Sequence, residues 1–337
     1  MIDYTSFYGR VSTLHKLLGR VRHPLFYYTQ HKETKAIACE LAEHPYELRR
    51  FWQFIEQHIN KTSKRYSTEE LHTNPPEADV YICGSDQVWS HDPSYFLDFV
   101  PEGKVRLAYA PSFGGISRFT PEYAARLSYL LGKFRAVSCR EQSGVNICHR
   151  LGRSDAVKVV DPTLLLTAED YDRVRQPRQP GRPYLLLYLL GSPIEMKVSE
   201  VYDYAAKRGL QVVYVASQGK VDSYPKLYAS IGEWIDLTAG AELVVTNSFH
   251  SAVFSLIYHR PFVLVPLTGG FSRMNTRTEE LLHATGLESR CYRGSLAEVA
   301  DGEALSFEVF DAYIARERAQ SQMFLERGLA PMVEKNS

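Results

Sequence analysis

The sequence predicts an α/β fold with two domains, each built on a parallel β-sheet flanked by helices. From residue 80 onward, short apolar segments alternate with amphipathic segments of helical length, which is the pattern of β–α units in a parallel sheet. The alternation stops once, in the charged and proline-containing residues 167–183, and then starts again. A chain of 337 residues is long enough for two such domains with a core each. We therefore expect a domain boundary within residues 167–183.

The composition argues against several classes of protein. The 39 Lys and Arg residues equal the 39 Asp and Glu residues, so no excess charge would attract nucleic acid or an anionic membrane. The 5 cysteines include no CxxC pair, which is typical of free thiols in a reducing compartment. The sequence shows no signal peptide and no apolar run of membrane-spanning length. These features predict a cytoplasmic protein without a transmembrane segment, with a peripheral position at the inner membrane face as an option.

Residues 1–170 are expected to form the N-terminal domain. Roughly the first seventy residues are predicted to be helical, with the clearest apolar stripe in residues 46–60, and residues 61–76 to be a surface connection. Apolar runs that end at turn-forming residues predict strands at residues 80–83, 105–110, 136–139 and 157–160. Helices are predicted at residues 121–131, with proline near the start, and at residues 141–151, closed by a glycine.

Residues 180–305 are expected to form the C-terminal domain, and residues 306–337 a terminal helix and tail. The predicted strands are residues 184–190, 211–215, 243–246 and 262–265. The predicted helices are residues 198–208, 231–239, 249–258 and 307–325. Parallel α/β sheets bind ligands at the carboxyl ends of their strands. The candidate functional residues are therefore those that follow each strand, around a cleft between the two domains.

The clearest of these strand ends is residues 244–251, with the sequence VVTNSFHS. A buried strand stops at Thr246, and Asn247 or Ser248 can cap the helix that follows. The first turn of that helix presents free backbone N–H groups and the positive end of the helix dipole, a ready site for phosphate or carboxylate. His250 lies in this turn, where it could meet a bound anion. The alternative is that His250 packs between the domains.

Arginines follow two further strands. Arg140 leaves a predicted strand into a helix start, beside Glu141, and is well placed to clamp an anion in a bidentate manner. The alternative is a salt-bridged surface arginine. Arg273 and Arg277 follow a glycine pair in an expected mobile loop, which could close over a phosphate. Here the alternative is a solvated basic loop.

Polar residues at two strand ends of the N-terminal domain suggest a sugar site. Asp86 and Gln87 follow the strand predicted at residues 80–83, so the carboxylate could bind sugar hydroxyls or act as a base, and Trp89 could stack on a sugar ring. The alternative is an N-cap with a core aromatic. Ser112 begins a loop with a glycine pair that allows close approach of a ligand, or that makes a tight turn.

Other motifs carry less information about function. Asp161 precedes a proline and is expected to shape a turn. Asp170 and Asp172 have the spacing of a metal-binding DxD but fall in a polar segment expected to be solvated. The sequence contains no GxGxxG, P-loop, HExxH or GxSxG.

Five motifs in this order resemble the polysaccharide pyruvyltransferase family. They are GSDQVW from Gly84, AYAPSFG from Ala108, SCREQSG from Ser138, VVDPTLLL from Val159 and VVTNSFHS from Val244. The resemblance implies two Rossmann-like domains in an arrangement similar to that of GT-B glycosyltransferases. It implies transfer of a pyruvyl group from phosphoenolpyruvate to two hydroxyls of a glycan sugar, forming a cyclic ketal in cell-envelope polysaccharide biosynthesis.

The resemblance also implies roles for residues. His250 would be the catalytic acid/base, and the donor would bind at Arg140, Ser248, Phe249 and Arg277. The acceptor, for which a lipid-linked glycan is an option, would bind at Asp86, Gln87, Trp89 and Ser112. Protonation of the methylene carbon makes C2 of the donor electrophilic; one hydroxyl attacks, phosphate leaves, and the second hydroxyl closes the ketal. No metal and no cofactor are implied.

This chain departs from the family pattern at two places. Family members carry an arginine two residues before the histidine, where this chain has Ser248, so phosphate binding is expected to depend on the helix terminus with Arg140 or Arg277. The first β–α unit of the family is expected to be missing before the segment that begins at Ile2. Two alternatives remain open: a GT-B glycosyltransferase that uses a nucleotide-sugar, and a non-catalytic sugar-binding relative.

Overall fold

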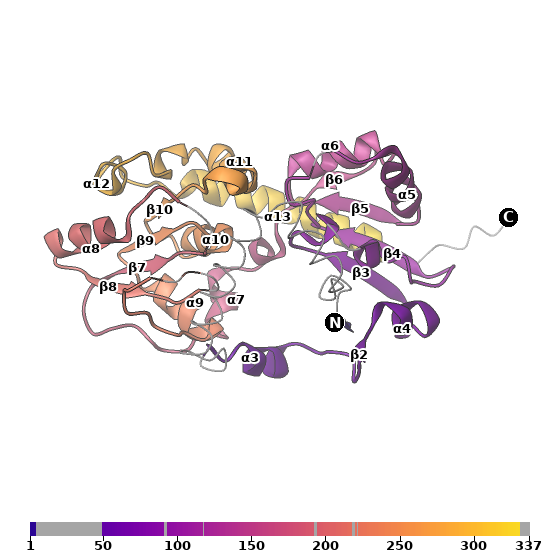
Figure 1. Ribbon diagram of the computed structural model, residues 1–337, viewed down its shortest axis with the longest axis horizontal. Helices are drawn as coiled ribbons and strands as arrows, with labels where there is room; N and C mark the ends of the chain where they lie inside the picture. Colours follow the sequence, from indigo (N-terminus) through magenta and orange to yellow (C-terminus); the bar gives the residue numbers. More distant parts are fainter. Residues whose placement is uncertain are drawn as a thin grey trace, which may run out of the picture. The chain divides into compact units, whose positions relative to one another are not determined.

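The structure, a computed structural model, is described here for residues 1–4, 49–90, 93–116, 118–191, 194–217, 220 and 222–330 (Figure 1). These residues form two compact units. Unit 1 contains Lys61–Leu165 together with residues 1–4 and 312–330, and unit 2 contains Leu166–Asp311 together with residues 49–60. The helices predicted before residue 49 lie outside the described residues.

Unit 1 is built on a parallel four-stranded sheet in the order β3-β4-β5-β6. Its strands are β3 (Val80–Gly84), β4 (Val105–Tyr109), β5 (Ala136–Cys139) and β6 (Val157–Lys158). Its helices are α4 (Thr68–Thr73), α5 (Pro121–Gly132), α6 (Gln142–Arg150) and most of α13 (Glu308–Leu329), with short 3₁₀ turns at Val88–Ser90, Pro93–Phe96 and Pro162–Leu165.

Helices cover both faces of this sheet. Apolar residues of α5 and α6 join the core that contains Cys83 and Val137. On the other face, α13 packs against Tyr109 through Phe324. It comes so close to β4 that a Cβ on Gly328 would lie 2.6 Å from a methyl carbon of Leu107. The central strands β4 and β5 are therefore buried on both faces, which explains their nearly continuous apolar runs.

Unit 2 contains a second parallel four-stranded sheet, in the order β10-β9-β7-β8. Its strands are β7 (Tyr184–Tyr188), β8 (Gln211–Tyr214), β9 (Leu243–Thr246) and β10 (Phe262–Leu264). Its helices are α3 (Phe51–His58), α7 (Ala168–Asp172), α8 (Val198–Lys207), α9 (Ile231–Ala239), α10 (Phe249–Ile257), α11 (Thr276–Thr285) and α12 (Leu296–Ala300), with 3₁₀ turns at Gly269–Asn275 and Glu288–Arg290.

The helices of unit 2 also divide between the two faces of its sheet. Leu185 and Leu187 of β7 share a core with α8 and α12. The helices α9 and α10 pack against each other, and Figure 1 shows them on the opposite side of the strands from α8 and α12. Two parallel sheets with helices on their faces confirm the predicted α/β fold class.

Two segments before residue 80 differ from their predictions. The surface connection expected at residues 61–76 contains β2 (Arg65–Tyr66), which pairs with β1 (Asp3–Tyr4), and then α4. Ser67 and Glu70 cap the N-terminus of α4 with a reciprocal capping box, a signal that is present in the sequence. In the helix predicted at residues 46–60, α3 begins at Phe51.

Among the described residues, no helix has both the length and the apolarity to cross a membrane.

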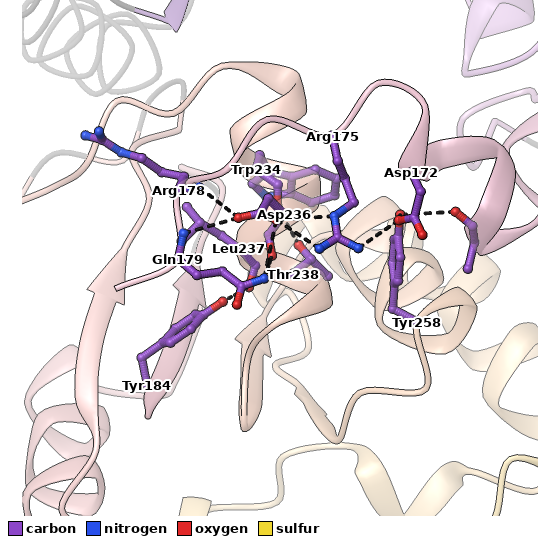
Figure 2. A network of polar contacts seen from close by, with 11 residues as sticks. Asp172, Arg175, Arg178, Gln179, Tyr184, Trp234, Asp236, Leu237, Thr238 and Tyr258 are labelled. Atoms are coloured by element: carbon purple, nitrogen blue, oxygen red, sulfur yellow. Dashed lines mark hydrogen bonds and ion pairs between the residues drawn. The ribbon is translucent and has the colours of Figure 1, made fainter. Parts of the chain in front are cut away.

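Asp236 of α9 attaches the segment that follows α7 to unit 2 (Figure 2). Its buried carboxylate accepts hydrogen bonds from the Arg175 guanidinium at 3.0 and 3.2 Å and from the backbone N–H groups of Arg178 and Gln179 at 2.8 and 3.1 Å. Hydrogen bonds to a charged acceptor contribute about 1.5–3 kcal/mol each. This part of the expected boundary segment therefore packs on unit 2.

Replacing Gly232 of α9 by alanine is expected to destabilise unit 2 by about 1–3 kcal/mol. The added Cβ would lie 2.4 Å from the backbone carbonyl oxygen of Val174, so the segment that Asp236 holds would have to shift. Urea denaturation measures the change in the free energy of unfolding. The matched control is Gly181→Ala, because a Cβ there meets nothing within 4 Å. Equal stability of the two variants would contradict the close packing described here.

Candidate active site

The turn between β9 and α10 is held by side chains of its own sequence. The Thr246 hydroxyl donates to the carbonyl oxygen of Tyr188 at 2.6 Å and accepts from the Ser248 N–H at 3.0 Å. The Asn247 side chain accepts from the Leu190 N–H at 2.7 Å and donates to the Leu190 carbonyl oxygen at 3.1 Å. Because its amide is used in this way, Asn247 connects the turn to the end of β7.

Ser248 is the N-cap of α10. Its hydroxyl oxygen accepts a hydrogen bond from the Ser251 N–H at 3.4 Å. The sequence left the cap open between Asn247 and Ser248, and the structure assigns it to Ser248. The helix therefore begins at Phe249, and the N–H groups of its first turn lie at the carboxyl end of β9, as the strand-end argument predicts.

Alanine at Ser248 is expected to lower the free energy of unfolding by about 0.5–2 kcal/mol, the usual cost of removing an N-cap hydroxyl. Threonine can accept the same hydrogen bond and should retain most of that stability. Chemical denaturation of the two variants beside the parent chain checks this. If alanine and threonine behave alike, the hydroxyl does not cap α10.

The predicted catalytic residue, His250, and two further predicted donor-binding residues lie close to this cap. His250 is half-buried in the first turn of α10, and its ring meets the Phe249 ring edge-to-face with centroids 5.3 Å apart. The guanidinium carbon of Arg277 lies 5.2 Å from the centroid of the same Phe249 ring, within the range of a cation–π contact. A helix terminus, an imidazole and a guanidinium thus lie together around Phe249.

Arg277 reaches this position from a helix. The prediction of a loop at Arg277 is wrong, because the 3₁₀ turn Gly269–Asn275 leads directly into α11, which begins at Thr276. Asn275 anchors the turn: its side chain accepts from the Leu267 N–H at 3.0 Å and donates to the Leu267 carbonyl oxygen at 2.9 Å. The sequence signal for this anchoring, a lone asparagine before a polar helix start, is weak.

In unit 1, Arg140 lies at the end of β5 in a cluster of carboxylates. Its Nη1 donates to Asp161 at 2.7 Å and its Nε donates to Glu141 at 3.0 Å. Its Nη2 lies 3.7 Å from a carboxylate oxygen of Asp86. Burial by itself would lower the pKa of Arg140, but the carboxylates of Glu141 and Asp161 outweigh it, so this pKa is raised above its ordinary value.

The loops after β3 and β4 are locked to each other. Ser85 and Asp86 have left-handed backbone conformations, with φ of 38° and 60°, which are costly for residues other than glycine. Three backbone hydrogen bonds hold them: Ser85 N–H to Tyr109 O at 3.3 Å, Ser112 N–H to Asp86 O at 2.8 Å, and Trp89 N–H to Ser112 O at 3.1 Å. The Asp86 side chain nevertheless stays 70% exposed.

The other predicted acceptor residues are buried or half-buried and contact neighbouring residues of unit 1. Trp89 is only 1% exposed, stacks on Phe96 with ring centroids 4.7 Å apart, and donates its indole N–H to the Tyr95 carbonyl oxygen. It is a core aromatic, the alternative that the sequence left open, and offers no face to a sugar. Ser112 is buried and accepts from the Gly114 N–H at 3.1 Å. Half-buried Gln87 packs beside the same glycine.

The remaining motifs have structural roles. Asp161 shapes the predicted turn by accepting from the N–H and the hydroxyl of Thr163 at 3.0 and 2.7 Å. Asp170 forms the capping box of α7 with Thr167, and Asp172 pairs with Arg175. The part of the chain that the structure describes contains no group of three or more His, Cys, Asp and Glu side chains suited to a metal ion.

Two thiols of unit 1, those of Cys83 and Cys139, are poor nucleophiles. Burial raises the pKa of Cys83 to about 12. The pKa of Cys139 is also raised, because its thiol contacts that of Cys148 at 3.6 Å and both are buried. Thiolate chemistry at these positions is therefore disfavoured near neutral pH.

Comparison with known proteins identifies a family. A family model described as polysaccharide pyruvyl transferase matches residues 16–267, more than half of the chain. The matched range includes the turn at Ser248 and the carboxylate cluster around Arg140. Among curated proteins, no match is found.

Proposed function

We propose that this protein transfers a pyruvyl group from phosphoenolpyruvate to two hydroxyls of a glycan sugar. The premise is that the chain belongs to the polysaccharide pyruvyl transferase family and is an enzyme of that type. The product is a cyclic ketal, and His250 is the general acid/base. A cytoplasmic location and a lipid-linked acceptor stay predictions of the sequence.

The observation that supports this proposal most is the composition of the α10 terminus. Phosphoenolpyruvate carries a phosphate and a carboxylate, so its site needs oriented N–H groups and a cation. The first turn of α10 supplies the N–H groups, and the Arg277 guanidinium over Phe249 supplies the cation. Two positive elements of different origin thus lie beside one imidazole.

His250 suits the proton transfers of this reaction. One proton must be added to the methylene carbon of the donor, and one must be removed from each attacking hydroxyl. An imidazole can both donate and accept protons near neutral pH. The expelled phosphate remains near the N-terminus of α10, where the helix dipole stabilises its negative charge.

A donor screen tests the proposal. Release of inorganic phosphate from phosphoenolpyruvate is measured with a panel of glycans, and the ketal product is identified by mass spectrometry. Thermal stabilisation by nucleotide-sugars but not by phosphoenolpyruvate would indicate a glycosyltransferase. Sugar binding without turnover of any donor would indicate a non-catalytic relative.

Arg277→Ala is expected to weaken phosphoenolpyruvate binding by roughly ten- to a hundredfold, because one charge-assisted contact of about 1.5–3 kcal/mol is lost. Calorimetric titration with phosphoenolpyruvate measures this. Arg293→Ala is the matched control, since Arg293 is an exposed arginine of the same unit. Equal donor affinity in both variants would remove Arg277 from the donor site.

A further inference from the structure

We propose that Arg140 acts in this reaction as a positioning residue for Asp86 on the acceptor side, and that the sugar bound there presents uncharged hydroxyls. This inference rests on the proposed pyruvyl transfer and deepens it. It differs from the sequence expectation, in which Arg140 binds the anionic donor.

The charges around Arg140 do not suit a donor site. Three carboxylates, those of Asp86, Glu141 and Asp161, lie within 3.7 Å of one guanidinium. Among the described residues, an anion arriving there would meet three carboxylates around one guanidinium, and like charges in close contact cost several kcal/mol. The donor carries two anionic groups, so the α10 terminus is the more favourable place for it.

The geometry around Arg140 suits a positioning role. Two of its nitrogens are fixed by hydrogen bonds to Asp161 and Glu141, whose side chains are almost fully buried. The third, Nη2, is thereby directed at Asp86, whose carboxylate is the exposed member of the cluster. The distance of 3.7 Å is that of an ion pair, so the guanidinium restrains the carboxylate without occupying both of its oxygens.

Asp86 is also restrained from its backbone side. The hydrogen bond from the Ser112 N–H to the Asp86 carbonyl oxygen holds the left-handed conformation that turns the residue out of β3. A carboxylate restrained at both ends can accept hydrogen bonds from two neighbouring hydroxyls of a sugar with little loss of entropy. Two neighbouring hydroxyls are what ketal formation consumes.

The first experiment is kinetic and uses three variants of the full chain. Asp86→Asn is expected to raise the KM for the glycan acceptor by roughly ten- to a hundredfold and to leave the KM for phosphoenolpyruvate unchanged. Arg140→Lys keeps the charge but not the planar set of donors that binds Asp161 and Glu141 together, and should raise the acceptor KM by about three- to tenfold. The double variant should have the same acceptor KM as Asp86→Asn alone, because Arg140 acts through Asp86.

Two results would overturn the inference. One is that Arg140→Lys raises the acceptor KM in the Asp86→Asn background by the same factor as in the parent chain. The other is that Arg140→Lys raises the KM for phosphoenolpyruvate. The second result would instead place Arg140 at the donor. Arg153→Lys is the control for a structural arginine, because Arg153 of unit 1 binds the carbonyl oxygens of Leu131 and Phe134. It should move neither KM.

A second experiment separates this inference from the proposed reaction. Saturation-transfer NMR with methyl glucoside and methyl galactoside detects sugar binding without any donor. Both should bind the parent chain and lose binding in Asp86→Asn, and methyl glucuronoside should bind at least about tenfold more weakly than methyl glucoside because of its carboxylate. This pattern without phosphate release from phosphoenolpyruvate would sink the proposed function and leave the acceptor site standing. Tighter binding of the glucuronoside, or no binding of either neutral sugar, would overturn the inference.

Discussion

His250→Ala is expected to lower kcat by at least about a hundredfold, the typical contribution of a positioned general acid/base. The physical reason is that both the protonation of the donor carbon and the deprotonation of the attacking hydroxyls lose their proton carrier. The KM for phosphoenolpyruvate should change far less, because the N–H groups of α10 and the Arg277 guanidinium remain. Steady-state phosphate release with the active glycan from the donor screen measures both constants.

The fold of this variant should be intact, because the side chain of His250 is half-buried and the cap of α10 is Ser248. A matched control is His283→Ala, since the His283 side chain is 85% exposed and pairs only with Glu288 in the ion pairs of the described chain. This control should keep the parent kcat. If His250→Ala also keeps it, the acid/base role must belong to another group.

Arg140→Met is expected to destabilise unit 1 by about 3–5 kcal/mol, the cost of removing one partner from a buried ion pair. Methionine fills the place of the arginine stem but has no guanidinium and no charge. Asp161, with a side-chain exposure of 1%, and Glu141 then keep buried carboxylates that have lost the Arg140 guanidinium. Urea denaturation followed by circular dichroism measures the loss.

Arg126→Met is the control for this prediction. Arg126 pairs with Asp98 of the same unit, but its side chain is 54% exposed, so its loss should cost at most about 1 kcal/mol. A small effect at both positions would mean that water reaches the carboxylates around Arg140. The kinetic test uses a different variant, Arg140→Lys, which retains the positive charge. The stability measurement with Arg140→Met is therefore a separate test.

Local patterns in the sequence were sufficient to predict the fold class and the place of His250. The strands of both sheets are short apolar runs that end at turn-forming residues, and this signal is contained within a few neighbouring positions. The helix α9 was predicted with the bounds at which it occurs, Ile231–Ala239. Likewise, the order of a buried strand, a serine cap and a helix is enough to put His250 in the first turn of α10.

The capping box of α4 shows that a local signal can also be missed. Ser67 and Glu70 have the required spacing, but the polar and proline-containing surroundings favoured a connection. The structure forms a helix here because Leu71 buries its side chain in the core of unit 1. Tertiary burial thus decided between two local readings of the same residues.

Only the tertiary structure decided what surrounds each candidate residue. Trp89 is a core residue because Phe96 and the loop after β4 close over it. Arg140 meets Asp161, 21 positions later in the chain, because parallel strands bring their carboxyl ends to the same edge of the sheet. Such contacts depend on which strands are neighbours, and no local pattern of hydrophobicity or capping encodes that. The sequence by itself therefore determined where polar residues leave the strands, and the packing of distant segments determined which of them stay exposed and which carry buried ion pairs.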